Sequence, residues 1–121
     1  MSSQPGTILT ALHYLFSHRL GKTIAHCLDL DLVTSGENLV EAENRLNAVV
    51  LQQIRACYTG GNFEQLCFKA TGEYWNALSN AREIEMMHLQ VEVPPVVLPV
   101  NRSIVSLPVY RHEAQEELQA V

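Results

Sequence analysis

The longest regular pattern in the chain is an apolar stripe that begins at Leu39. Apolar residues recur there at three- and four-residue steps, and polar residues fill the positions between them. The stripe consists of Leu39, Ala42, Leu46, Val49, Val50, Ile54 and Cys57. This spacing predicts an amphipathic helix over residues 39–58 that buries one face.

Both ends of this helix carry recognisable signals. Asn38 and Glu41 are three residues apart and predict a capping box, in which Asn38 accepts from a free helix N–H and Glu41 reaches back to the Asn38 N–H. Gly60 and Gly61 predict the end of the helix, because glycine tolerates the left-handed backbone that satisfies the last carbonyls. Gly36 is expected to supply a permissive backbone for the sharp turn into the helix.

Before the helix, three short segments are expected to be strands. Residues 7–17 match a helical stripe as well, but their Thr, Ile and Tyr content and the turn at 19–22 favour the first arm of a hairpin. Residues 23–28 form the returning strand, and residues 30–34 a third strand. After the helix, residues 83–93 alternate between polar and apolar positions and predict a half-buried strand.

Two shorter helical pieces are expected between the long helix and this last strand. Asn62 and Gln65 form a second capping-box pattern. Thr71 is positioned to cap a third piece that holds Tyr74, Trp75 and Leu78, with Trp75 as a packing anchor.

From Pro94 onward the chain becomes rich in proline and aliphatic residues. Proline fixes φ and lacks an N–H, which favours extended backbone and argues against a central strand or a helix interior. We therefore predict two parts, a domain over residues 1–93 and an extended apolar arm with a short terminal helix (111–120) over residues 94–121. The arm is too apolar for a solvated linker, so it is expected to cover the chain's own core or a neighbouring subunit. The expected interface residues are Val96, Val97, Leu98, Val100, Ile104, Val105, Leu107 and Val109.

Composition narrows the classes of function. The 121 residues suit one core; 47% are hydrophobic and 17% charged, which argues against disorder and favours self-association as a dimer or larger homo-oligomer. The net charge of −5 and the scattered basic residues argue against nucleic-acid binding by this chain alone. The apolar run 8–16 is too short for a membrane span and lacks the features of a signal peptide, so we expect a cytoplasmic protein with no membrane association.

Candidate chemistry is sparse. Cys27, Cys57 and Cys67 are odd in number with no Cys-x-x-Cys unit, and are expected to be reduced, buried thiols. His26 and Cys27 are adjacent, which on a strand places them on opposite faces and argues against a catalytic dyad. Asp29 and Asp31 would share one face of an extended segment and could form a carboxylate cluster with a helix-start glutamate, Glu37 or Glu41.

A structural role is the preferred interpretation of these carboxylates and of the histidines. Carboxylates at a sheet end before a helix N-terminus are explained by turn chemistry and the helix dipole. The five histidines show neither the i, i+4 spacing nor the His-x-His pattern of a zinc site. They are His13, His18, His26, His88 and His112. We therefore expect no catalytic residues, no metal and no cofactor.

Two segments, Ala25-His26-Cys27-Leu28-Asp29-Leu30 and Thr34-Ser35-Gly36-Glu37-Asn38-Leu39-Val40-Glu41-Ala42, resemble the HicB-like antitoxin domain family. The resemblance covers about residues 7–60, and residues 70–75 look like a segment of related HicB-like proteins. It implies an α+β fold: a small antiparallel sheet of three to four strands with helices packed on one face, similar to a truncated ribonuclease H core. It also implies a domain that covers a small protein toxin and often oligomerises.

The chain departs from the family pattern in two places. Only 13 residues follow Pro108, too few for the DNA-binding module of full HicB-type antitoxins. The segment Leu28-Asp29-Leu30-Asp31-Leu32 replaces the usual Pro-Asp-Leu-Pro-Gly turn. The sequence therefore predicts a non-enzymatic, antitoxin-like protein-interaction domain. The alternatives are a self-associating structural protein and a degenerate metal-dependent nuclease that uses Asp29 and Asp31.

Overall fold

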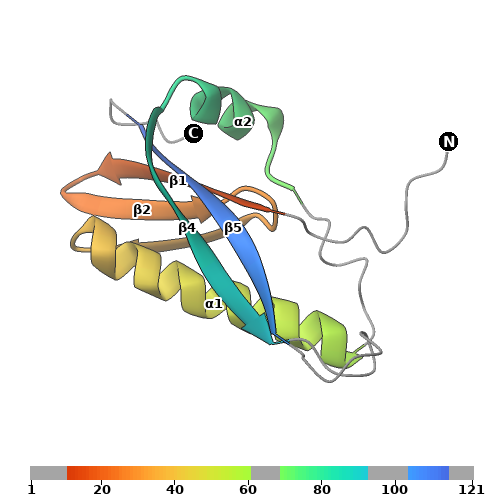
Figure 1. The fold of residues 1–121 in the computed structure, drawn as a ribbon. Coiled ribbons are helices and arrows are strands. Elements are labelled where there is room, and N and C mark those ends of the chain that lie inside the picture. Colours follow the sequence, from red (N-terminus) through yellow and green to blue (C-terminus); the bar gives the residue numbers. More distant parts are fainter. Residues whose placement is uncertain (1–10, 61–68, 93–103, 115–121) are drawn as a thin grey trace, which may run out of the picture.

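Five strands and two helices make up the described part of the chain, which in this computed structural model comprises residues 11–60, 69–92 and 104–114 (Figure 1). The elements are β1 (Leu12–Arg19), β2 (Lys22–Cys27), β3 (Leu32–Gly36), α1 (Leu39–Gly60), α2 (Gly72–Ser79), β4 (Arg82–Glu92) and β5 (Ile104–Glu113). The strands form one sheet in the order β3-β2-β1-β5-β4. Neighbours are antiparallel except β1 and β5, which are parallel. The α+β class is confirmed, with a larger sheet than the three to four strands predicted.

The hairpin of β1 and β2 confirms the choice of strand over helix for the described part of residues 7–17. A two-residue turn at Leu20 and Gly21 connects the strands, with φ angles of 54° and 80°. Positive φ at both central residues is the geometry that matches the twist of a tight hairpin. Pairing begins at Arg19 and Lys22, and this fixes the register of the whole hairpin.

Helix α1 runs two residues beyond the predicted 39–58 and starts where the capping signal lies. The Glu41 N–H donates to Asn38 Oδ1 at 2.9 Å, as expected of a cap. Glu41 Oε1 accepts from the Glu37 N–H at 2.7 Å, instead of from the Asn38 N–H that the sequence suggested. Five of the seven residues of the predicted stripe are at most 2% exposed, and Leu39 and Val49 are half-buried. The five are Ala42, Leu46, Val50, Ile54 and Cys57.

Gly36 is required for a reason other than the predicted one. Its φ is not positive, so no special backbone is needed there. A Cβ at this position would lie 2.7 Å from the backbone N of Ala42 and 3.0 Å from Cβ of Glu41. The end of β3 thus passes so close to the first turn of α1 that only glycine fits.

The described part of the predicted arm is extended and covers the chain's own core, which was one of the two surfaces expected for it. The prediction against a central strand is wrong, because residues 104–113 form strand β5 between β1 and β4. Pro108 lies inside this strand. It pairs with His88 on β4 and immediately precedes Val109, the first β5 residue that pairs with β1. The missing N–H therefore falls where pairing with β1 begins, which is how a proline is accommodated in an interior strand. The predicted terminal helix is also wrong at Arg111–Glu113, which are strand.

The two helices cover opposite faces of the sheet, whereas the resemblance implied one face (Figure 1). Successive side chains of a strand point to opposite faces. Accordingly Leu12, Tyr14 and Phe16 of β1 join the core under α1, while Leu15 joins a second cluster with Leu78 of α2. The α2 face is the one that carries the candidate site.

The alternation predicted for 83–93 is confirmed for Leu89 and Val91, which are buried. A bulge between Ile84 and Met87 shifts the register of β4 against β5. Because one extra residue changes the side on which the following side chains lie, Ile84 and Met87 both pack against the α1 core. The sequence placed these two on opposite faces.

Candidate functional site

The turn between β2 and β3 holds two carboxylates, and each binds a different histidine. Asp29 accepts the backbone N–H of His13 on Oδ1, and its Oδ2 lies 3.0 Å from His13 Nδ1. Asp31, in the left-handed conformation with φ 54°, places Oδ1 2.8 Å from His26 Nε2. The prediction that Asp29 and Asp31 could converge on one metal is therefore wrong, because each is committed to its own imidazole.

The two glutamates considered as further ligands also lie elsewhere. Glu37 forms an ion pair with Lys22, which holds its pKa below the ordinary value of 4.5. Glu41 belongs to the helix cap. Among residues 11–60, 69–92 and 104–114, no three His, Cys, Asp or Glu side chains lie close enough together to hold a metal ion.

Helix α2 places one aromatic ring on each of the two histidines. The Trp75 ring meets His13 edge-on, with centroids 5.3 Å apart, and Tyr74 meets His26 edge-on at 4.7 Å. Tyr110 of β5 stacks on His13 at 5.5 Å. Edge contacts of this kind stabilise by about 1 kcal/mol each beyond the buried area. Trp75 is thus a packing anchor, as predicted, and also one wall of a pocket.

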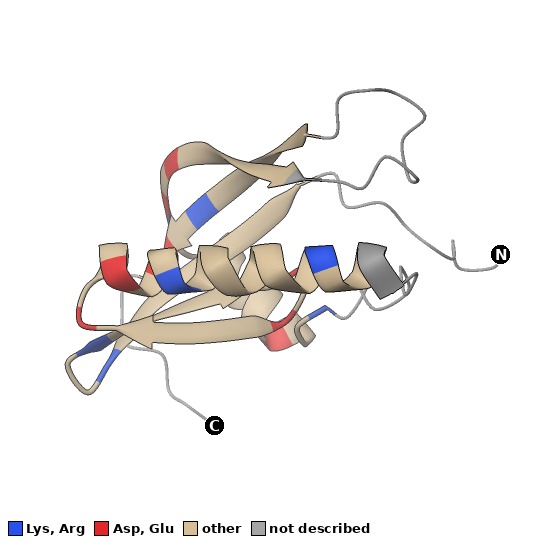
Figure 2. Ribbon diagram, turned by 90° about the horizontal axis from the view of Figure 1, so that it is seen from below, with Lys and Arg blue, Asp and Glu red and all other residues tan. Residues whose placement is uncertain are grey.

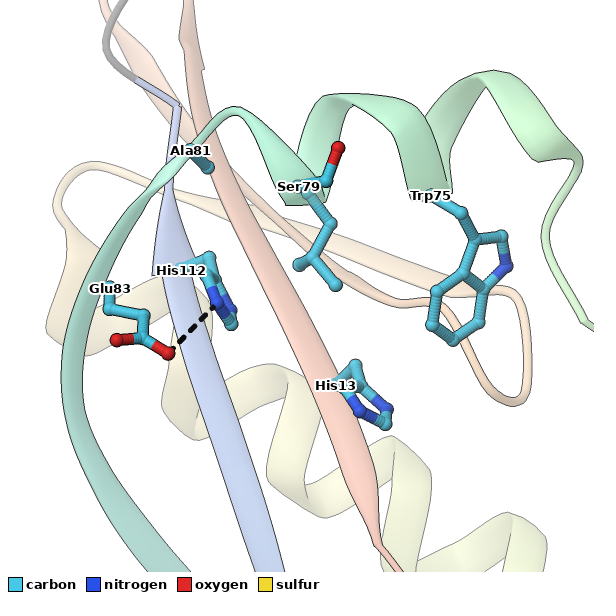
Figure 3. A pocket seen from close by; sticks show the side chains of 7 residues that line it. His13, Trp75, Ser79, Ala81, Glu83 and His112 are labelled. Atoms are coloured by element: carbon cyan, nitrogen blue, oxygen red, sulfur yellow. Dashed lines mark ion pairs between the residues drawn. The ribbon is translucent and has the colours of Figure 1, made fainter.

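This pocket, of about 570 Å³, opens between α2, β1 and the start of the β4–β5 hairpin (Figure 3). Its lining residues include His13, Trp75, Leu78, Ala81, Glu83 and His112. Ser79 also lines it, but its Oγ donates to the carbonyl of Asn76 at 2.8 Å and points away from His13 (Figure 3). A Ser-His-Asp arrangement with His13 and Asp29 is therefore not formed.

Two imidazoles line the pocket. Asp29 binds His13 at Nδ1, which fixes the proton there in the neutral ring and leaves Nε2 as a lone-pair acceptor. His112 Nε2 lies 3.8 Å from Glu83 Oε2, too long for a hydrogen bond. His112 Nδ1 is buried with no hydrogen-bond partner in the described part of the chain.

The thiols lie away from the pocket. Cys27 and Cys57 are free and buried, as predicted, and Cys67 lies outside the described residues. Burial raises the pKa of Cys27 to about 12, with a smaller contribution from Asp29, and burial also raises that of Cys57. Cys27 faces the α1 core while His26 faces α2, so the expected separation of these neighbours is confirmed.

The predicted interface residues divide into three groups. Val96, Val97, Leu98 and Val100 lie outside the described residues. Leu107 and Val109 are buried in the chain's own core and are not available to a partner. Val105 is half-buried against that core, and Ile104 is 52% exposed.

The sequence interpretation missed His13, His26 and His112 as members of a site. A signal for the first two was present in the hairpin. Once the turn pairs Arg19 with Lys22, His26 lies opposite Leu15 and thus on the same sheet face as His13. The Asp29 and Asp31 contacts depend on the conformation of the following turn, and the approach of His112 depends on β5 lying beside β1. Neither the turn conformation nor the position of β5 can be predicted from the local sequence pattern.

The class that fold and site define is an α+β domain with a five-stranded, mostly antiparallel sheet and a histidine- and aromatic-lined pocket on one face. Comparison with protein-family models, curated proteins and solved structures found no match. Within the described residues, neither helix has the length and apolar character needed to cross a bilayer.

Proposed function

We propose that this chain is a non-enzymatic protein-interaction domain that binds an extended segment of a partner along the second half of β4. The observation that carries the proposal is the contrast between the two halves of this strand. β4 is at one end of the strand order, so one side of it has no neighbouring strand in the described part of the chain. An unpaired strand edge is a template for strand addition.

The first half of β4 is protected against such pairing. It carries Arg82, Glu83 and Glu85, followed by the bulge, and charges and bulges are the usual means by which proteins block an edge. Figure 2 shows acidic positions, in red, where β4 begins, while Glu92 is the acidic residue at the other end of the strand. Met86 to Val91 carries no Asp, Glu, Lys, Arg or Pro. A partner strand can therefore pair with these six residues without burying a charge, whereas Glu92 ends the strand just beyond them.

Four neighbouring sheet positions beside the Met86–Val91 stretch are also uncharged. His88 and Gln90 of β4 pair with Pro108 and Ser106 of β5, and all four face away from the α1 core. Ile104, 52% exposed, begins β5 and pairs with Glu92, the acidic residue that ends β4. Depletion of charge at an accessible, partly apolar surface is the compositional mark of an interface core.

We propose further that the domain is HicB-like and antitoxin-like, with a small protein toxin as the partner. The support is the segment from Ala25 to Ala42, which resembles that family and which contains the end of β2, the third strand and the capped start of α1. The opposite-face helices and the interior β5 are departures from the expected family fold. The family assignment therefore depends on the strand-glycine-helix segment alone.

A second candidate function is self-association through the same edge. Two copies of β4 paired antiparallel about Leu89 would place Met87 opposite Val91 and His88 opposite Gln90, with no charged side chain among them. An edge that is complementary to itself in this way supports a symmetric dimer. The particle mass distinguishes the two, since a dimer has twice the 13.5 kDa of the chain.

The experiment compares two double variants. Lysines at His88 and Gln90, both exposed, add charge to the proposed edge; lysines at Gln52 and Ala56, both exposed on α1, add equal charge elsewhere. Tagged chains are used to capture partners from cells that express the native gene neighbourhood, and masses are measured by light scattering. We expect the His88→Lys/Gln90→Lys chain to lose partner or dimer at least tenfold and the α1 variant to retain it. Equal retention by both variants contradicts the proposal.

A further inference from the structure

The pocket beside α2 is separate from the edge of β4 proposed to bind a partner. Two of the polar groups that line it have in common that they accept hydrogen bonds. Glu83 contributes a carboxylate whose side chain is 83% exposed, and His13 contributes a nitrogen held as an acceptor by Asp29. Among the described residues, no Lys or Arg lines the pocket. The adjacent Arg82 is bound to Glu113.

The second imidazole adds an unsatisfied atom. His112 lines the pocket, and its Nδ1 is buried and without a hydrogen-bond partner among the described residues. Buried polar atoms are nearly always hydrogen-bonded, so such an atom in a pocket-lining ring indicates a missing partner. The groups at the pocket with an assigned role, the Glu83 carboxylate and the His13 nitrogen, both accept hydrogen bonds.

The wall beside His13 is aromatic. Trp75 donates its only N–H to the carbonyl of Ala70 at 3.2 Å, so it offers the pocket an aromatic ring and no donor (Figure 3). Tryptophan is the side chain that attracts cations most strongly through its ring face. The Glu83 carboxylate, the acceptor nitrogen of His13 and the indole ring of Trp75 together favour a positively charged ligand that carries N–H groups.

We propose that this pocket binds a small organic cation of the alkylguanidinium or alkylammonium class. The cation lies against Trp75, donates to His13 Nε2 and is neutralised by Glu83. An organic anion is disfavoured because Glu83 would repel it with no cationic side chain to compensate. A bare metal ion is disfavoured because three ligating side chains do not converge in the described residues. This inference does not depend on the proposed protein partner.

The chain contains a single tryptophan, so its emission reports on the pocket wall directly. We would titrate the full chain at pH 8, at which an ordinary imidazole is neutral, with n-butylguanidinium and with n-butylurea, its uncharged analogue of similar shape. Histidine ring signals in NMR spectra would be followed in parallel. We expect butylguanidinium to change Trp75 emission and to shift the His13 and His112 signals, with a dissociation constant on the order of 1 mM for a ligand of this size. Butylurea and butyrate should bind at least tenfold more weakly.

Two matched variants test the role of charge. Glu83→Gln removes the carboxylate at the pocket, and Glu85→Gln removes a nearby exposed carboxylate of the same strand that does not line it. Both side chains are exposed, so the fold is retained, which the NMR spectra check. We expect Glu83→Gln to weaken butylguanidinium binding about threefold, as for a solvent-screened ion pair, and Glu85→Gln to leave it unchanged. Three results would overturn the proposal. They are no binding of butylguanidinium at about 20 times the expected dissociation constant, binding of butylurea as strong as that of butylguanidinium, and equal effects of the two variants.

Discussion

An ion pair between α1 and β5 should be one of the strongest single contributions to stability in this chain. Arg111 binds Glu43 with two hydrogen bonds of 2.7 Å, from Nε and from Nη2. Its Nη1 donates to the carbonyl of Glu85 at 2.9 Å, and its guanidinium lies 5.8 Å from the ring centroid of Phe16. One side chain thus joins the helix, β1, and the bulged part of β4 to the interior strand.

The size of the effect follows from burial. The side chains of Arg111 and Glu43 are 17% and 10% exposed, so removal of one partner leaves a charge that water reaches poorly. Breaking a buried pair in this way costs about 3 to 5 kcal/mol, and the residual exposure places this pair at about 3 kcal/mol. A domain of this size has a total stability of about 5 to 15 kcal/mol. Glu43→Ala should therefore lower the melting temperature by about 10 °C.

The assay is urea unfolding followed by circular dichroism for Glu43→Ala, Arg111→Met, the double variant Glu43→Leu/Arg111→Met, and Glu85→Gln as an exposed control. The double variant should be more stable than either single variant, because apolar replacement of both partners leaves no buried charge. Glu85→Gln should change the free energy of unfolding by less than about 0.5 kcal/mol. A loss below about 1 kcal/mol in Glu43→Ala, or additive effects of the two single substitutions, would refute the reasoning.

Three further predictions concern the backbone and a buried thiol. Leu20 has φ 54° and is 85% exposed, so Leu20→Asn should raise the free energy of unfolding by about 1 kcal/mol; a loss in urea unfolding would contradict this. Gly36→Ala should lower it by about 2 kcal/mol, since the new Cβ meets the Ala42 backbone; an unchanged urea midpoint would contradict the close approach. Burial raises the pKa of Cys27 from 9.0 to about 12. The protonated thiol therefore contributes to the free energy of unfolding below pH 9, and this contribution is lost as the pH rises toward 12. Stability should therefore fall less steeply above pH 9 in Cys27→Ala, and parallel profiles would argue against this assignment.

Local signals in the sequence predicted the order and type of the elements up to residue 60, although β3 lies at Leu32–Gly36 and not at the predicted 30–34. The Asn38 cap, the one-sided stripe of α1 and the turn at Leu20 and Gly21 are decided by contacts within a few residues, and these predictions are confirmed. The position of β5 is decided by long-range pairing instead. Pro108 led to the prediction that this segment is not an interior strand, because the local sequence does not show that pairing with β1 begins only at Val109.

The candidate site shows the same division. Trp75 was expected to be an anchor because an aromatic residue on a short helix usually is, but its contact with His13 requires α2 to lie on the face opposite α1. The alternative in which Asp29 and Asp31 act together depended on their being two residues apart. The left-handed backbone at Asp31 turns the second carboxylate to a different histidine, and residue spacing does not report such a change of direction.

Amide hydrogen exchange tests the central claim, that a partner pairs with the second half of β4, most directly. The comparison is between the isolated chain, or its dilute monomer, and the captured complex or dimer. Outward-facing amides among residues 87–91 should exchange freely in the first and become protected in the second, while β3 at the other end of the sheet stays unchanged. Protection that appears on β3 instead, or no new protection on β4, would contradict the account.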